Sequence, residues 1–239
     1  MKQKILALAS LFLIVAFSSS CIFIGPSIKG NGKVVEEKRK AGKFDEIKVS
    51  RGMNVYISQG DETKIVVKAD ENLLDLIETE VEGRVLKVTT NQNIRRATSK
   101  KVFITVPKLE SIRSAAGSNV FSETVIECEN MEVHSSAGSN IKLELTAKDL
   151  NVSASAGSNI KLEGTAKSFI GKASAGANIK AEGLKTNDCE VRVSSGSNIW
   201  ITVKGDFEAH ASSGGNIFYY GNPDHLNVEN SSGGNIIKK

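Results

Sequence analysis

The stretch SAGSNIKLEG, residues 155–164, decides the fold because close copies of it recur along the chain. SAGSNIKLEL precedes it at 136–145, and SAGANIKAEG follows it at 174–183. Aligned on glycine, seven copies are separated by 18 to 21 residues, and each has an Asn two residues after the Gly. A period near twenty residues is typical of a solenoid. The repeated pairs are Gly117 and Asn119, Gly138 and Asn140, Gly157 and Asn159, Gly176 and Asn178, Gly196 and Asn198, Gly214 and Asn216, and Gly233 and Asn235.

Each copy alternates between apolar and polar residues, as in Ile160, Lys161, Leu162 and Glu163. A period of two indicates β-strands, and residues 114–239 show no helical periodicity, which excludes leucine-rich and helical repeats. Strands that recur once per repeat and stack on their copies form a parallel β-helix. We therefore predict an all-β, single-stranded parallel β-helix with rungs of about 19 residues, spaced about 4.8 Å apart.

The recurring spacing of the corner has a physical explanation. Glycine permits a backbone conformation that other residues avoid. Asn tolerates the same region, and its amide can bond to the Asn of the next rung. The β-branched residue after each Asn then begins an inward column. We predict that the repeated Gly and Asn residues form a structural ladder along the solenoid.

Residues 41–113 are less regular than residues 114–239. TKIVVKA (63–69), RVLKVTT (84–90) and KVFITVP (101–107) read as strands from their β-branched content. The segment 71–83 favours a helical turn before a strand. No linker divides the halves, so we predict one domain over 41–239 in which irregular turns at 41–113 cap the regular rungs.

The N-terminus resembles an export signal. Lys2 and Lys4 precede an apolar run over residues 5–17, which is too short to span a bilayer, so residues 1–20 read as a signal peptide. Small residues before Cys21 resemble the lipobox of bacterial lipoproteins. In that class Cys21 is lipidated and residues 21–40 form a tether to the membrane, which places the protein in the cell envelope, on the outer membrane. The alternative is ordinary cleavage after Ser20 without lipidation.

Composition excludes one class of partner. Without Lys2 and Lys4, 29 basic residues face 27 acidic ones, because residues 1–20 contain no Asp or Glu. A chain this close to neutral gives no electrostatic case for nucleic-acid binding.

Four segments together resemble a known family. They are FDEIKVSRGMNVYISQG (44–60), ENLLDLIETEVEGRVLKV (71–88), VFITVPKLESI (102–112) and the later Gly-x-Asn-Ile copies. The chain is similar to the "putative auto-transporter adhesin, head GIN domain" family, found in exported and lipoprotein-like proteins of Bacteroidetes. The resemblance extends from about Phe44 to the C-terminus. It implies a right-handed single-stranded β-helix, an exported location and no established catalytic activity.

Stacked rows of charged residues offer candidate chemistry. Glu144, Glu163 and Glu182 are expected in one outward row, next to a lysine row. Carboxylates about 5 Å apart would suit a retaining glycosidase. Any charged position in a repeat produces such a row, however, and the lysines offset the repulsion. The lysines of the neighbouring row are Lys142, Lys161 and Lys180.

The sequence predicts no metal site, no cofactor and no disulfide. His134 and His210 share a column but lie four rungs apart, about 19 Å. Cys128 and Cys189 fall near the offset of Leu150, so both are expected inward. They lie three rungs or about 14 Å apart, whereas a disulfide needs Cα atoms within about 7 Å.

One surface departs from the polar pattern. The outward column after each Asn becomes apolar toward the C-terminus, where Trp200, Phe218, Tyr220 and Ile237 should form an exposed contact patch. Such patches mark surfaces for partners, glycans or self-association. The sequence therefore favours a non-enzymatic, envelope-anchored adhesin or glycan-binding or protein-binding module. The alternatives are a self-assembling structural solenoid and a polysaccharide-active enzyme that uses the Glu row.

Overall fold

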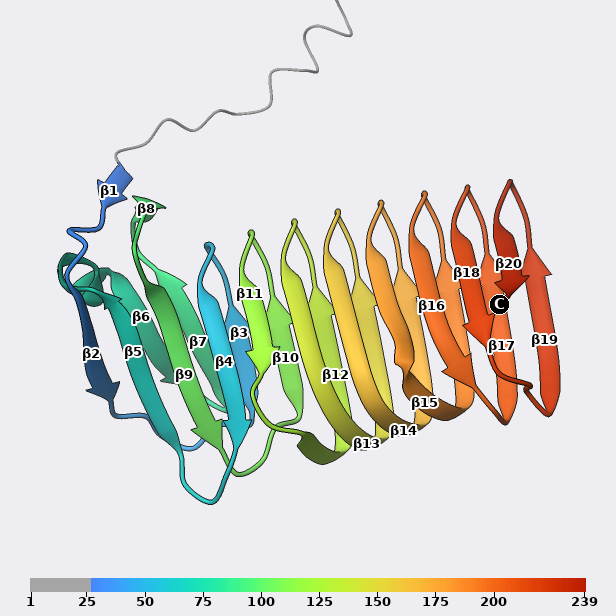
Figure 1. The fold of residues 1–239 in the computed structure, drawn as a ribbon, viewed down its shortest axis with the longest axis horizontal. Helices are drawn as coiled ribbons and strands as arrows, with labels where there is room; N and C mark the ends of the chain where they lie inside the picture. Colours follow the sequence, from blue (N-terminus) through green and yellow to red (C-terminus); the bar gives the residue numbers. More distant parts are fainter. Residues whose placement is uncertain (1–26) are drawn as a thin grey trace, which may run out of the picture.

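The computed structural model describes residues 27–239, which form a β-solenoid joined to a mixed sheet (Figure 1). This confirms the all-β solenoid with a spacing of about 19 residues. The signal segment, Cys21 and the first part of the tether lie outside the described residues. The strands are β1 (Ser27–Lys29), β2 (Val34–Arg39), β3 (Glu46–Val49), β4 (Asn54–Gln59), β5 (Lys64–Asp70), β6 (Ile77–Glu82), β7 (Val85–Thr90), β8 (Asn93–Arg96), β9 (Lys100–Val106), β10 (Ser111–Ser114), β11 (Asn119–Ser122), β12 (Ile126–Ser135), β13 (Asn140–Ala154), β14 (Asn159–Ala173), β15 (Asn178–Val193), β16 (Asn198–Val203), β17 (Asp206–Ala211), β18 (Asn216–Tyr220), β19 (His225–Asn230) and β20 (Asn235–Lys238).

The rungs stack as parallel strands in the register that the repeat predicts. Asn140 pairs with Asn159, and Asn159 pairs with Asn178. In the middle of the solenoid, β13, β14 and β15 each wrap around the lower edge as one strand of 15 or 16 residues (Figure 1). Toward the C-terminal end each rung is instead split into two strands. The turns between rungs lie along the upper edge of the molecule (Figure 1).

Each rung has two sides, with the core between them. We call the side that begins at the repeated Asn the Asn face; it contains β4, β11, β16, β18, β20 and the first parts of β13 to β15. The other side, with β3, β10, β17 and β19, is the opposite face. Ile141 and Leu143 point inward from the Asn face, and Leu150 and Val152 point inward from the opposite face.

The core is filled by matching large residues to small ones. Phe169 is fully buried, and a Cβ added to Gly171 would lie 2.5 Å from its ring. Gly171 stands in the column of Val152 and Val191, so the missing side chain leaves space for Phe169. Close packing of this kind explains why one rung can carry a Phe where its neighbours carry Leu150 and Cys189.

The corner differs from the expectation, because the residue before the glycine, and not the Asn after it, shares the left-handed conformation. Two successive residues have positive φ angles, 49° at Ala156 and 69° at Gly157. A non-glycine residue in this region is destabilised by about 1 kcal/mol. The turn is stabilised by its neighbours, because the Gly157 amide donates to the carbonyl of Ala175 at 3.0 Å in the next turn. The buried Ser158 hydroxyl donates to the Ser135 carbonyl at 2.7 Å.

The repeated Asn side chains form a continuous chain of amide hydrogen bonds. Each Nδ2 donates to the Oδ1 of the preceding rung, at 3.1 Å from Asn159 to Asn140 and 3.0 Å from Asn178 to Asn159. The chain has one more member than the seven repeats, because Asn119 donates to Asn54 at 2.8 Å. The members are Asn54, Asn119, Asn140, Asn159, Asn178, Asn198, Asn216 and Asn235.

The irregular half contains one regular rung. β4 pairs in parallel with β11 on one side and with β9 on the other, so the chain leaves the solenoid after residue 59 and returns at residue 111. Between these points it forms antiparallel pairs, β5 with β9 and β6 with β7. The three predicted strands are confirmed as β5, β7 and β9. The predicted helical turn is the 3-10 helix η1 (Glu71–Leu76).

The tether is shorter than the sequence predicts. Residues 34–39 form β2, which pairs antiparallel with β5, and residues 27–29 form β1, which pairs in parallel with β8. VVEEKR has no alternation of apolar and polar residues, so it carries no local strand signal, although the exposure of its side chains alternates in the structure. Its charges suit a sheet edge, where they oppose pairing with another chain. The part of the tether from residue 27 onward therefore belongs to the folded body.

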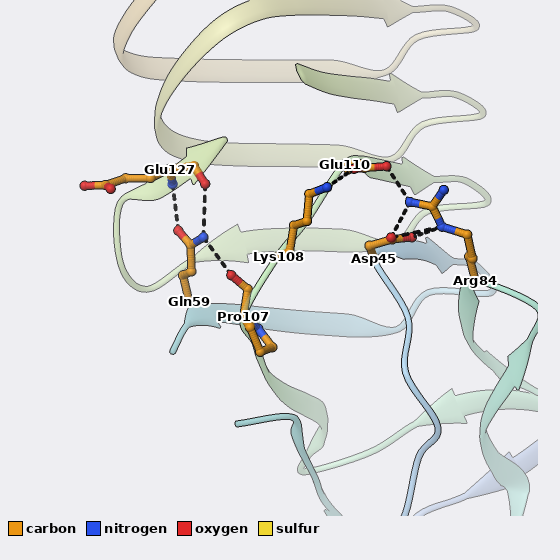
Figure 2. A network of polar contacts seen from close by, with 7 residues as sticks. All are labelled: Asp45, Gln59, Arg84, Pro107, Lys108, Glu110 and Glu127. Atoms are coloured by element: carbon orange, nitrogen blue, oxygen red, sulfur yellow. Dashed lines mark hydrogen bonds and ion pairs between the residues drawn. The ribbon is translucent and has the colours of Figure 1, made fainter. Parts of the chain in front are cut away.

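Side-chain contacts attach the segment between residues 59 and 111, which lies outside the regular rungs, to the solenoid (Figure 2). Gln59 donates to the carbonyls of Pro107 and Glu127, each at 3.0 Å, and accepts from the Glu127 amide at 2.7 Å. Nearby, Arg84 forms a forked ion pair with Asp45 and also contacts Glu110. Hydrogen bonds from Lys108 and then Arg84 hold the pKa of Glu110 below its usual value. These contacts therefore fix the chain at the point where it passes from the mixed sheet into the solenoid.

A buried carboxylate fastens the N-terminal strands to the same body. Asp70 is fully buried and accepts hydrogen bonds from the amides of Ser99, Gly32 and Thr98, at 2.8, 3.0 and 3.2 Å. A Cβ on Gly30 would lie 2.0 Å from the Asp70 carboxylate, so only glycine fits there. Burial by itself would raise the pKa of Asp70, but the backbone donors outweigh burial and lower it.

We predict that Asp70→Asn lowers the free energy of unfolding by about 2–3 kcal/mol at neutral pH, because an amide leaves buried donors unpaired. The folded-state pKa of Asp70 lies below its unfolded value of about 3.9, so its contribution is complete above that pH. It is lost as pH falls through the folded-state pKa. Urea unfolding at several pH values tests both effects, with the exposed Asp61→Asn as the control. Equal stability losses in the two variants would contradict the prediction.

We predict that Asn159→Ala lowers the free energy of unfolding by about 1–2 kcal/mol, because it interrupts the amide chain in the middle and removes two hydrogen bonds. Asn151, an exposed residue of the same β-structure, has no side-chain hydrogen bond among those of residues 27–239 and supplies a matched control. Chemical denaturation of Asn159→Ala and Asn151→Ala compares them directly. A change at Asn151 as large as that at Asn159 would show that the ladder adds no stability.

Candidate functional site

The candidate site is an outward column on the Asn face, two residues after the ladder, and we call it the aromatic–lysine column. Two aromatic stacks flank three lysines on successive rungs. Neighbouring members are joined by strand register, as between Trp200 and Phe218. In spatial order the column is Phe103, Tyr56, Phe121, Lys142, Lys161, Lys180, Trp200, Phe218 and Ile237.

The C-terminal stack contains most of the predicted patch. The Trp200 and Phe218 rings stack with centroids 5.2 Å apart and an interplanar angle of 16°. Lys180 lies over the Trp200 ring at 5.8 Å, and the ammonium of Lys239 lies over Phe218 at 5.3 Å. Both rings are half-buried, and only Ile237 of the patch is exposed, at 39%.

The ring contacts limit how this stack can bind. Trp200 lies between Lys180 and Phe218 along the column, so its ring faces are used inside the protein. The surface left for a partner is the ring edges. Tyr220 is half-buried in the neighbouring column, where it pairs with Thr202, so it widens the patch without joining the stack.

The sequence did not reveal the N-terminal stack. The rings of Phe103 and Tyr56 stack at 5.0 Å, and those of Tyr56 and Phe121 stack at 5.3 Å. Gly52, Asn54 and Val55 form a degenerate copy of the corner, and Tyr56 stands two residues after Asn54, the offset of Trp200 after its own Asn, so position in the repeat marks Tyr56 as a member of the column. Phe103 belongs to β9, outside the repeat, and only the fold brings it beside Tyr56.

The predicted glutamate row is wrong at its last member. Glu144 pairs with Glu163, but Glu163 pairs with Gly183 because β15 contains a register irregularity, so Glu182 does not continue the row. Glu163 also forms an ion pair with Lys161 at 2.7 Å. The hydrogen bond from Lys161 lowers the pKa of Glu163. A general acid at neutral pH needs a raised pKa, so Glu163 is unsuited to that role.

The three histidines are engaged in local contacts. His210 contacts Glu208 at 2.8 Å and Glu229 at 3.2 Å, and His225 contacts Asp206 at 2.8 Å. His134 is registered with Ser153, four rungs before His210. Over residues 27–239 no group of three or more His, Cys, Asp or Glu side chains is placed to hold a metal ion.

The cysteines differ from each other. Cys189 is buried in the column of Phe169 as expected, whereas Cys128 is half-buried and pairs with Ala147. Met131, not Cys128, occupies the column of Leu150, because Met131 lies 14 residues after Gly117 whereas Leu150 lies 12 after Gly138, so the first rung shifts the alignment on glycine by two residues. Both are free thiols. Burial raises the pKa of Cys128 to about 11 and raises that of Cys189 further, so neither is poised to react.

These features define a class of protein, a β-solenoid that presents a broad ladder surface. Residues 43–223 match the family described as "Putative auto-transporter adhesin, head GIN domain". The chain belongs to this adhesin family, as its sequence resemblance indicated. An adhesin family suggests a location outside the cytoplasm, and no helix within residues 27–239 is long and apolar enough to cross a bilayer.

Solved structures show the same fold. A "putative adhesin" from Bacteroides fragilis is 24% identical, with a TM-score of 0.84 over 89% of this chain and 100% of that one. A "putative lipid binding protein" from Parabacteroides distasonis is 23% identical, with a TM-score of 0.72 over 90% and 100%. A "putative adhesin" from Parabacteroides merdae is 18% identical, with a TM-score of 0.67 over 90% and 100%. A search of curated proteins finds no match to the chain.

Proposed function

We propose that this protein is a non-enzymatic adhesin, anchored in the cell envelope through Cys21, that binds an extended glycan or protein ligand along the aromatic–lysine column. The observation that carries the proposal is the stacked pair of Trp200 and Phe218 on an outward column. Aromatic side chains are enriched at binding hot spots, and a β-solenoid holds them at fixed spacing without an ordering cost.

The geometry favours a ligand that lies along the column over a single sugar stacked on one ring. The faces of Trp200 are occupied by Lys180 and Phe218, so a ligand meets ring edges and the lysine side chains between the stacks. From Tyr56 to Trp200 the column spans five rung steps, about 24 Å. An extended polymer or peptide can contact both stacks over that length.

The arrangement of the predicted glutamate row supports a non-enzymatic role. The carboxylates of the predicted row are out of register at Glu182, and Glu163 is paired with Lys161. Activity screens on acidic and neutral glycans, with Glu163→Gln as the comparison, test this part. If the unchanged protein cleaves a glycan and Glu163→Gln abolishes that activity, the non-enzymatic role is overturned in favour of a polysaccharide-active enzyme.

We predict that Trp200→Ala with Phe218→Ala weakens ligand binding by about 30-fold, since truncating hot-spot aromatics removes about 2 kcal/mol or more. The measurement is binding to a glycan array and to candidate envelope proteins, followed by titration of each ligand found. Tyr56→Ala with Phe121→Ala tests the N-terminal stack in the same way. Unchanged binding by both double variants would remove the column as the contact surface, and loss only in Tyr56→Ala with Phe121→Ala would move the site to the N-terminal stack.

One observation favours self-association as the second candidate function. In the last described rung, Leu226 and Val228 occupy positions that are inward in other rungs, yet they are 50% and 45% exposed. The opposite end is covered by the charged, antiparallel β2, which hinders head-to-tail stacking. Analytical ultracentrifugation over a range of concentrations tests whether the protein self-associates. A monomer at all concentrations excludes self-assembly.

A further inference from the structure

The N-terminal end of the solenoid carries three exposed basic side chains on one short ribbon. β1 and β8 form a two-stranded parallel ribbon apart from the large sheet, and the chain enters the structure through β1 (Figure 1). Lys29, Arg95 and Arg96 on this ribbon are exposed, and none of them forms an ion pair within the part of the chain that the structure describes. Of the acids next to the ribbon, Asp70 accepts hydrogen bonds from backbone amides, and its neighbour Glu71 is paired with Lys33 at 2.7 Å.

The charge continues beyond the ribbon. Residues 83–109 contain seven basic residues and no acidic one. Residues 27–113 as a whole carry 18 basic and 13 acidic residues, a net charge of +5, whereas residues 114–239 carry 11 and 14, a net charge of −3. The nearly neutral composition therefore conceals a basic end and an acidic end, separated along the solenoid axis.

The ribbon is rigidly attached to the body. The Gly30 amide donates to the carbonyl of Arg96 at 2.8 Å, and Ile28 pairs with Ile94. Asp70 fastens both sides of the ribbon, because it binds the amides of Gly32 and Thr98. A force or contact on the ribbon is therefore transmitted to the solenoid.

We propose that the β1–β8 ribbon binds an anionic phospholipid surface through Lys29, Arg95 and Arg96 and holds the solenoid upright on the membrane. The inference rests on the proposed envelope anchor. Six residue steps separate Cys21 from Ser27, a distance of at most about 21 Å, so an anchor at Cys21 keeps the ribbon near the headgroups. Each cation near an anionic surface contributes about 1 kcal/mol, and the acidic C-terminal half is repelled.

This orientation places the proposed binding surface away from the membrane. The C-terminal aromatic stack lies at the end of the solenoid away from β1 (Figure 1). With the basic end on the membrane, the solenoid acts as a spacer that presents Trp200 and Phe218 outward. Phospholipid is favoured over an acidic glycan or nucleic acid because the ribbon lies where the chain enters the fold from its N-terminal segment.

The test uses the chain from Ile22, which keeps every described residue and carries no lipid. At low ionic strength it should sediment with vesicles of phosphatidylcholine and phosphatidylglycerol, but not with phosphatidylcholine alone, and salt should weaken the binding. Lys29→Gln with Arg95→Gln and Arg96→Gln should reduce the affinity on the order of 100-fold. Lys148→Gln with Lys167→Gln and Lys185→Gln removes the same charge from exposed positions elsewhere and should leave the affinity unchanged.

Three outcomes would overturn the inference: no binding to the anionic vesicles, equal loss in the two triple variants, or binding to heparin without binding to vesicles. Circular dichroism checks that each variant remains folded. Labelling cells with a palmitate analogue, with Cys21→Ser as control, tests the anchor separately. Labelled protein that fails to bind vesicles overturns the ribbon alone, whereas unlabelled protein with ribbon-dependent binding overturns the anchor and retains the ribbon.

Discussion

The structure depends on in-register stacking of one rung on the next. Asn159 is hydrogen-bonded through its side chain to Asn140 below and Asn178 above, while Ile160 packs on its copies in the core. A shift of one residue would turn every inward side chain to solvent and break the amide chain at once. The same register that buries the core therefore also fixes each outward column. The surface is regular because the inward and outward side chains alternate along the same strands.

The surface columns are where the repeat is free to vary. The position two residues after Asn is Lys in the middle of the solenoid and aromatic toward both ends, as at Tyr56 and Trp200. Because the backbone geometry is the same at each rung, a change of side chain there alters binding chemistry without altering the fold. This division between a constant ladder and a variable column is what an adhesin scaffold needs, and the two aromatic stacks are its most distinctive feature.

The two ends of the solenoid differ in net charge. The basic N-terminal end, the β1–β8 ribbon and the buried Asp70 together connect the body to the segment that precedes it. The acidic half and the Trp200–Phe218 stack lie toward the other end. An anionic surface would orient a rigid body with opposite charges at its two ends, and this is the arrangement that the proposed membrane contact and the proposed binding patch require.

The sequence by itself determined the solenoid, because seven copies of Gly-x-Asn with period-two flanks can bury their apolar faces only by stacking. It also determined the Asn ladder and most of the C-terminal patch, since each follows from position within the repeat. Tertiary structure decided what lies outside the repeat. Phe103 joins Tyr56, the tether contains β2, and Glu182 leaves the glutamate row, because strand pairing between segments far apart in the chain, and one irregularity in β15, set these contacts. Pairing partners of that kind have no local sequence signal.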